Sequence, residues 1–212
     1  LEVMITFTPQ ESQWLIGFFL NFLLILSGQR IPLLTPKGWI HAGILGTILW
    51  GCLGWKGWLA VVSYLALGSI VTKVGFAYKE AIGIAEKRGG RRGPENVWGS
   101  AATGVVLAIL IEIGWGSEDL LLIAFSASFA AKLGDTFGSE IGKRWGKRTF
   151  LITTFKPVPG GTEGAISVEG TIASLIGCIS MAFILRSLSL IPNSLALSIV
   201  IISGFLATIL ES

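Results

Sequence analysis

The sequence predicts an all-α fold, a multi-pass integral membrane bundle of about seven transmembrane helices in one membrane-embedded domain over residues 1–212. Hydrophobic residues make up 52% of the chain and charged residues only 14%. The mean hydropathy is +0.74. A soluble domain usually carries about 25% charged residues, so much of this apolar surface must face lipid. At about 20 residues per crossing, a chain of 212 residues has room for seven spans and two long loops.

Each span is predicted from an apolar run bounded by charges or turn residues. The runs cover residues 12–28, 38–54, 57–75, 97–114, 117–134, 168–187 and 190–210. The first run is retained as a span, because acidic residues precede it where a signal peptide would have basic ones. Only Gly54, Trp55 and Lys56 separate the second and third runs, so these form either a tight helical hairpin or one broken element. We favour the hairpin.

The distribution of basic residues supports this choice. On the seven-span interpretation, fourteen of the 16 Lys and Arg residues fall on one side, and only Lys56 and Arg186 fall on the other. By the positive-inside rule, the amino terminus then lies outside and the basic side is cytoplasmic or stromal. The same side receives two polar loops, at about residues 76–96 and 135–167, which are therefore the predicted location of any chemistry.

Composition excludes several kinds of site. Cys52 and Cys178 lie far apart in apolar runs, which argues against a disulfide framework or a structural zinc site. His41 is the only histidine, so a histidine-bound metal or a Ser-His-Asp triad is poorly supported. No soluble basic surface is present, so nucleic acid is not an expected partner.

A glycine stripe marks the start of the second polar loop. Glycine recurs every four residues at Gly134, Gly138, Gly142 and Gly146. Close helix packing alone is one explanation. The other explanation is a functional site, because ionisable groups are costly at the end of a transmembrane span and are usually functional there. The neighbouring ionisable and hydroxyl groups are Lys132, Asp135, Thr136, Ser139 and Glu140. On a regular helix Asp135 and Glu140 point about 140° apart, so both meet one cation only if the helix breaks near Gly138.

Carboxylates beside basic residues suit magnesium and polyphosphate chemistry. We expect Asp135, Glu140 and Lys143 to be catalytic, with Asp135 and Glu140 as metal ligands and Glu163 as a further one. Lys132, Thr136 and Ser139 are expected to contact the phosphates or nucleotide. The alternative is that the basic residues only follow the positive-inside rule and contact anionic lipid.

Two further segments offer phosphate-binding groups. The run from Lys156 to Thr171 can bring backbone N–H groups and the amino end of the next span to phosphate oxygens, through Lys156, Gly160, Gly161, Thr162, Gly164 and Ser167. The first loop contributes Arg88, Arg91, Arg92 and Asn96. For the run from Lys156 to Thr171, the alternative is a flexible re-entrant turn. For the first loop, the alternative is solvated charge that follows the positive-inside rule. The glycine spacing excludes a P-loop.

Four runs carry a family resemblance: LTPKG at 34–38, KEAIGIAEKRGGRRGPENVWGS at 79–100, AAKLGDTFGSEIGK at 130–143 and TTFKPVPGGTEGAISVEGT at 153–171. They resemble the membrane family that contains phytyl-phosphate kinase of plastids and cyanobacteria, related to phytol kinase, dolichol kinase and CDP-diacylglycerol synthase. The resemblance implies a magnesium-assisted kinase that uses CTP to convert phytyl or another prenyl monophosphate to the diphosphate for tocopherol or related prenyl-lipid synthesis. It also implies a bacterial inner, thylakoid or plastid membrane.

The alternatives are a prenyl-alcohol kinase, a cytidylyltransferase that forms a CDP-lipid and, in another class, a transporter. The expected partners are the lipid phosphate, the nucleotide and membrane lipids, with a homodimer as a possible assembly. A monophosphate acceptor brings about two negative charges, and twelve Lys and Arg residues lie in and beside the two loops. No histidine is present in either loop to act as a base for an alcohol. These features favour the monophosphate.

Overall fold

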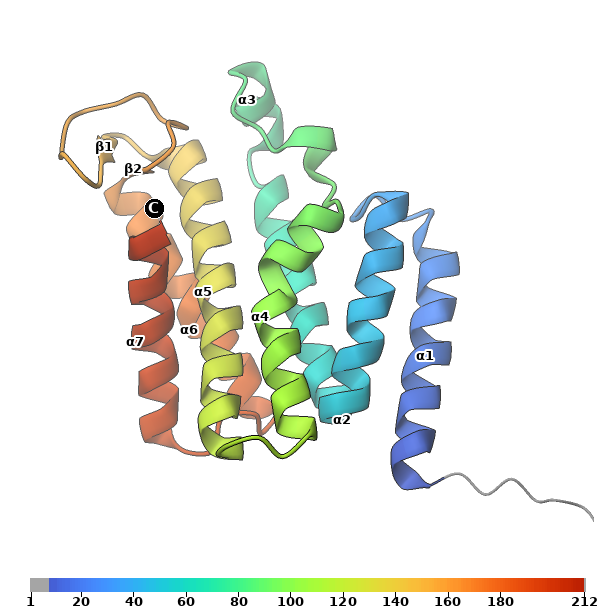
Figure 1. The fold of residues 1–212 in the computed structure, drawn as a ribbon. Coiled ribbons are helices and arrows are strands. Elements are labelled where there is room, and N and C mark those ends of the chain that lie inside the picture. The colour runs from blue at the N-terminus through green and yellow to red at the C-terminus, as the bar shows by residue number, and fades with distance from the viewer. Residues whose placement is uncertain (1–7, 212) are drawn as a thin grey trace, which may run out of the picture.

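The computed structural model describes residues 8–211, and the expected outside position of the amino terminus concerns residues beyond that range. It is predominantly helical, as predicted (Figure 1). The elements are α1 (Pro9–Gly28), α2 (Pro36–Lys73), α3 (Phe76–Ala81), the 3-10 turn η1 (Lys87–Gly90), α4 (Pro94–Glu112), α5 (Glu118–Trp145), β1 (Phe150–Leu151), β2 (Ala165–Ile166), α6 (Val168–Ser187) and α7 (Ser194–Glu211). The two strands form a small antiparallel pair.

Helix α2 is a hairpin, as the sequence predicts. Gly54 interrupts it with φ +65° and ψ −163°, a backbone conformation that residues with a side chain rarely adopt. A straight helix of 38 residues would be about 57 Å long. Instead, Leu34, just before the first arm, pairs with Arg92, and Arg92 also lies against Gly68 near the end of the second arm. Both ends of α2 therefore lie at the same end of the bundle (Figure 1).

Six helices in the described part of the chain are long and apolar enough to cross a membrane, and α2 supplies two arms. The predicted arrangement of seven apolar segments is thus confirmed. Helix α5 is central, since it packs against α2, α4, α6 and α7, whereas α1 packs mainly against α2 at one edge (Figure 1). Phe125, Phe129 and Leu133 of α5 are fully buried in this core. Many large apolar side chains remain exposed, including Phe19, Ile70 and Leu120, as expected of a surface that contacts lipid.

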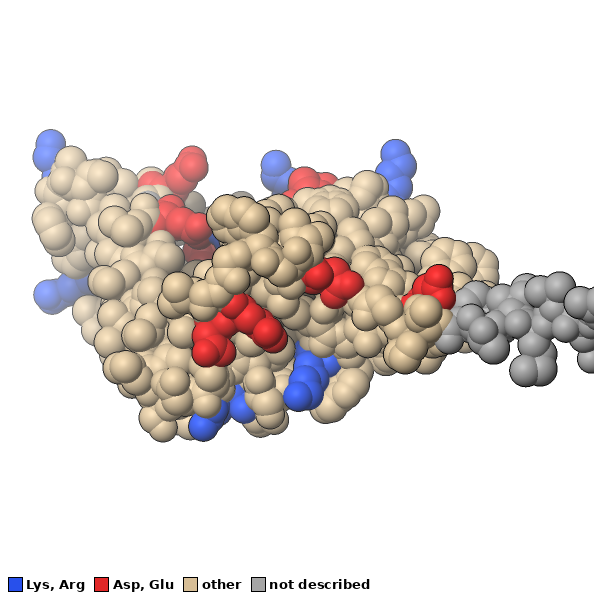
Figure 2. Space-filling model, turned by 60° about the horizontal axis from the view of Figure 1, so that its bottom comes forward, with Lys and Arg blue, Asp and Glu red and all other residues tan. Residues whose placement is uncertain are grey.

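The two polar loops lie at the same end of the bundle. Lys143 on α5 forms an ion pair with Glu86 of the first loop at 3.3 Å. A methyl group on Gly161 of the second loop would lie 2.8 Å from Ile84 of the first, so these loops are in direct contact. Figure 2 brings the opposite end forward, with acidic side chains near the middle of the view and basic ones mainly along its edges. The prediction that the two loops share one end of the bundle is therefore confirmed.

Candidate functional site

Helix α5 carries the predicted catalytic residues, and the predicted boundary at residue 134 is wrong. The helix is continuous from Glu118 to Trp145, without the break near Gly138 that a shared cation would require. Glycine lowers helix propensity by about 1 kcal/mol, but tertiary packing overrides it here. A side chain at Gly138 would lie 2.1 Å from Ser174 Oγ, and one at Gly134 would lie 2.4 Å from Cys178 Sγ. The glycines thus allow close contact with α6, while polar side chains occupy other faces of α5.

A charged cavity of about 620 Å³ lies on one side of α5, between this helix and the first polar loop. We call it the basic cavity. Its lining includes the predicted residues Arg88, Arg91, Arg92, Asn96, Lys132, Asp135, Thr136, Ser139 and Glu140. Tyr64, Glu86, Lys87, Glu95 and Ser100 also line it. The structure therefore places the basic residues of the first loop beside the polar stretch of α5, in a lining that also contains four carboxylates.

A second cavity, of about 540 Å³, lies between α5, the second polar loop and the start of α6. We call it the glycine-loop cavity. The predicted residues in its lining are Asp135, Ser139, Lys143, Gly161, Thr162, Glu163, Gly164 and Ser167. Two of its glycines have a left-handed backbone, with φ +87° at Gly161 and +76° at Gly164. Lys156 and Gly160 are exposed and lie outside the lining of both cavities.

Asp135 and Ser139 line both cavities, so the two cavities meet at this stretch of α5. The Asp135 carboxylate is half-buried, and no hydrogen bond or ion pair engages it within residues 8–211. The Ser139 hydroxyl donates to the Thr136 carbonyl oxygen at 3.2 Å. Asp135 is therefore an acidic group at the junction of two polar cavities, with the charges of Lys132 and Lys143 nearby but no direct ion pair to either.

Glu140 has a different environment from Asp135. Its carboxylate accepts a hydrogen bond from Lys79 of α3, and the two side chains form an ion pair that is almost completely buried. Lys79 Nζ also donates to the Thr72 carbonyl oxygen at 3.0 Å. The sequence did not single out Lys79, because a pairing across 61 residues leaves no local spacing pattern. The predicted metal role of Glu140 thus competes with this lysine.

The donor groups fit a magnesium ion only in part. No cluster of three or more His, Cys, Asp or Glu side chains in the described residues is arranged to hold a metal. Magnesium, however, is commonly held by one or two carboxylates together with substrate phosphates and water. The unpaired carboxylate of Asp135 suits that arrangement, whereas the ion-paired carboxylate of Glu140 does not.

Several of the predicted phosphate-binding side chains are engaged within the protein. Arg88 pairs with Glu95, Lys132 Nζ pairs with Glu211 at 2.7 Å, and the Ser167 hydroxyl caps α6 by accepting from Gly170 N at 3.1 Å. Asn96 Oδ1 accepts from Gly93 N at 3.0 Å, at the start of α4. Arg91 is exposed.

Arg92 is held at the edge of the basic cavity by Tyr64. Its Nη1 donates to the Tyr64 hydroxyl at 2.6 Å, and that hydroxyl donates to Ser100 Oγ at 2.7 Å. The guanidinium carbon lies 4.9 Å from the centre of the Tyr64 ring. Sequence reasoning identified Arg92 but missed Tyr64 and Ser100. The only available signal was that Tyr64 is one of just two tyrosines, placed inside an apolar run.

Comparisons with known proteins agree with this membrane architecture. A family model described as "Integral membrane protein DUF92" matches residues 19–212. The chain is 48% identical over 202 residues to "Uncharacterized membrane protein sll0875" of Synechocystis sp., which covers 94% of this chain and 78% of that protein. It is 42% identical over 186 residues to "Protein VTE6, chloroplastic" of Arabidopsis thaliana, covering 85% of this chain and 56% of that protein.

A more distant relative is "Uncharacterized membrane protein MJ0933" of Methanocaldococcus jannaschii, 34% identical over 167 residues, which cover 77% of this chain and 68% of that protein. The chain thus spans little more than half the length of the plant relative. No solved structure matches the chain. The membrane family that the sequence motifs indicated is confirmed by these matches.

Proposed function

Because the chain belongs to the DUF92 family of integral membrane proteins, with the motifs and cavities described above, we propose that it is a CTP-dependent prenyl-phosphate kinase. It converts phytyl or another prenyl monophosphate to the diphosphate at the membrane surface. Its two polar loops face the cytoplasm or stroma. The motif resemblance to the phytyl-phosphate kinase family suggests the substrate class and the nucleotide.

The observation that carries the proposal is the position of Asp135. A half-buried carboxylate without an ion pair lies where two polar cavities meet, at one end of the helical bundle. An ionisable group in such a place is expensive and usually functional. Two substrates, one in each cavity, would then meet beside the same carboxylate.

We assign the triphosphate to the glycine-loop cavity. Gly161 and Gly164 let the backbone approach phosphate oxygens closely, and the amino end of α6 directs its positive dipole end toward the same space. Lys143 and Thr162 add a positive charge and a hydroxyl to the lining. Asp135 would hold the magnesium ion, which when bound neutralises phosphate charge and orients the transferring group.

We assign the acceptor phosphate to the basic cavity. Arg91 and Arg92 offset the charge of the monophosphate, and Tyr64 fixes the Arg92 guanidinium. An oxygen of the acceptor phosphate then attacks the γ-phosphorus of the nucleotide, the bond to the β-phosphate oxygen breaks, and CDP leaves. Positioning and charge neutralisation are the main demands of this reaction, and no histidine base is needed.

Product identity tests the proposal. The purified chain is incubated with CTP, magnesium and either phytyl phosphate or phytol, and nucleotides and lipids are separated. We expect CDP and a prenyl diphosphate from phytyl phosphate and no product from phytol. Pyrophosphate with a CDP-lipid would assign a cytidylyltransferase, and phosphorylation of phytol alone would assign an alcohol kinase. Transport of a solute across a membrane without any nucleotide turnover would instead indicate a transporter.

A further inference from the structure

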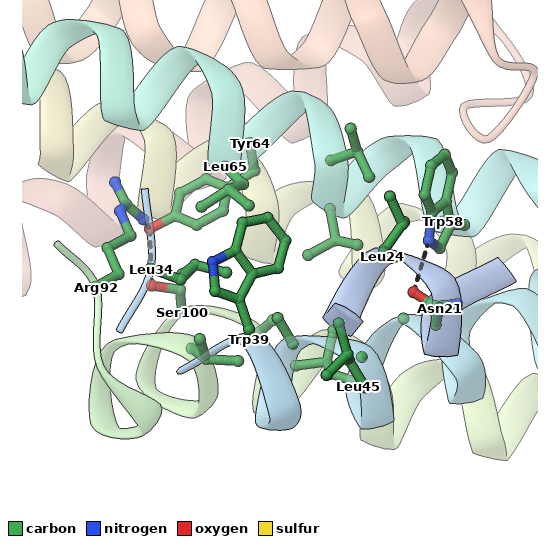
Figure 3. A pocket seen from close by; sticks show the side chains of 18 of the residues that line it. Asn21, Leu24, Leu34, Trp39, Leu45, Trp58, Tyr64, Leu65, Arg92 and Ser100 are labelled. Atoms are coloured by element: carbon green, nitrogen blue, oxygen red, sulfur yellow. Dashed lines mark hydrogen bonds between the residues drawn. The ribbon is translucent and has the colours of Figure 1, made fainter. Parts of the chain in front are cut away.

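A narrow apolar slot lies beside the basic cavity, in the membrane-spanning part of the bundle (Figure 3). It lies between α1, both arms of α2 and α4, and its lining includes Ile25, Trp39, Leu45, Val61 and Leu65. Its volume of about 80 Å³ is far below that of the basic cavity, about 620 Å³. Pockets for whole ligands usually measure about 300–1,000 Å³, so this slot admits only a thin apolar chain.

One end of the slot borders the basic cavity. Tyr64, Arg92, Asn96 and Ser100 line both spaces. In Figure 3 the Arg92 guanidinium and the Tyr64 hydroxyl lie together at this end, near Ser100. A molecule with an anionic head and an apolar tail would therefore place its head beside Arg92 and its tail among apolar side chains.

The other end is closed by a hydrogen-bonded pair. Trp58 Nε1 donates to Asn21 Oδ1 at 3.1 Å, and Asn21 Nδ2 donates to the Gly17 carbonyl oxygen at 2.8 Å (Figure 3). Asn21 is only 4% exposed, and its polar groups are satisfied within the protein, so this end offers no site to a headgroup. Trp58 and Tyr64 lie six residues apart on one helix, which corresponds to about 9 Å along its axis.

We propose that this slot binds the phosphate-proximal part of the acceptor's isoprenoid chain and that the Asn21–Trp58 pair limits how far the chain enters. The remainder of the chain leaves past Leu24, which borders the slot and is 36% exposed toward lipid. The inference rests on the proposed function for the identity of the occupant. The Arg92 charge, at the border with the basic cavity, favours a lipid phosphate, and the narrowness of the slot favours one chain over the two chains of a phospholipid.

Photo-crosslinking tests the location independently of turnover. A prenyl phosphate with a diazirine on its first isoprene unit is bound to the purified wild-type protein in detergent and irradiated. We expect labelled peptides from α1, α2 and α4, and protection by excess unlabelled prenyl phosphate but not by phosphatidylglycerol. Labels confined to α5, α6 and α7 would overturn the proposal. Equal protection by phosphatidylglycerol would mean that the slot holds ordinary membrane lipid.

A matched pair of substitutions tests the role of the slot in activity. Ala42 lines the slot, whereas Ala66 on the other arm of α2 is exposed and lies outside it. Changes within an apolar pocket alter discrimination by roughly tenfold or more, so Ala42→Phe should raise the KM for the lipid acceptor by about that factor and leave the KM for CTP unchanged. Ala66→Phe should leave both unchanged.

The two proposals fail in different ways. Correct crosslinking without any phosphorylation would refute the kinase and leave the slot standing as a lipid-phosphate site. Phosphorylation with an unchanged acceptor KM in a folded Ala42→Phe protein would refute the slot and leave the kinase standing. Thermal unfolding in detergent establishes whether both variants are folded. If Ala42→Phe is unfolded, crosslinking of the wild-type protein decides where the lipid chain binds.

Discussion

Lys79 and Glu140 form a buried ion pair that fastens the short helix α3 to the long helix α5. The lysine side chain has no solvent exposure, and the residue Glu140 has 2%. Breaking a buried pair by removing one partner is costly because the other charge remains unpaired. The pair therefore sets the position of the first polar loop relative to the polar stretch of α5.

The structural role of this pair predicts a non-additive pattern of stability. Glu140→Gln alone should lower the free energy of unfolding by roughly 3–5 kcal/mol, because Lys79 stays buried without its partner. The combination of Lys79→Met with Glu140→Leu should recover most of that loss. Unfolding of the single and double variants in detergent measures both. A double variant that is stable yet completely inactive, with magnesium binding lost, would instead support Glu140 as a metal ligand.

Asp135 should be indispensable for turnover. Asp135→Asn keeps the size of the side chain and removes its charge, so a loss of several kcal/mol in transition-state stabilisation, about 100-fold or more in rate, is expected. Asp119→Asn, an exposed change at the other end of α5, is the matched control and should be neutral. Activity is measured over a magnesium titration in both. Near-normal rates for Asp135→Asn at limiting magnesium would exclude its metal role.

Gly68 provides the space occupied by the Arg92 guanidinium. A methyl group at this position would lie 2.3 Å from Arg92 Nη2, so Gly68→Ala must displace the side chain. We expect a higher KM for the lipid phosphate with little change in stability, since the obstructed group is the end of a flexible side chain. Ala66→Val, on the same arm but facing outward, should have no such effect. An unchanged acceptor KM in Gly68→Ala would argue against Arg92 as a phosphate ligand.

The charge of the basic cavity should make binding sensitive to salt. Arg91→Gln with Arg92→Gln should raise the KM for the phosphorylated acceptor, and the increase should be larger at 10 mM than at 150 mM salt, where the screening length is only about 8 Å. Arg30→Gln removes an exposed charge outside the cavity lining and serves as the control. Equal effects of the control and the double variant would mean that Arg91 and Arg92 act only through the general surface potential.

Labelling of single cysteines tests the membrane orientation. Arg91→Cys and Lys147→Cys should react with an impermeant thiol reagent from one side, and Glu118→Cys from the other, in a protein whose Cys52 and Cys178 have been replaced by alanine. All three positions are exposed. Sealed vesicles of known orientation provide the measurement. Reaction of positions 91 and 147 from opposite sides would contradict a shared active face.

The helices and the shared polar face could be predicted because their signals are local. Apolar runs and basic loops are visible within some 20 residues, and the Gly54-Trp55-Lys56 segment marked the hairpin turn. The extension of α5 to Trp145 was missed because its glycines and charges are typical of a loop in isolation. Only packing against Ser174 and Cys178 of α6 explains why these residues stay helical.

The site could be predicted in composition but not in its pairings. Asp135 and the bases of the first loop stood out as charges at the mouth of a span. The partnerships of Lys79 with Glu140 and of Tyr64 with Arg92 join distant segments, across 61 and 28 residues, and follow from tertiary packing alone. The apolar slot depends in the same way on three helices that meet only in the folded bundle.

The turn at Gly54 also constrains how the protein enters its membrane. The two arms of α2 are joined at Gly54 with no long polar segment between them. We therefore expect the two arms to enter the bilayer together, as a helical pair. In the proposed orientation, Lys56 is the one charged side chain of this pair that has to cross the bilayer. Because Lys56 lies beside the turn, its ammonium group ends at the far interface, where it stays hydrated.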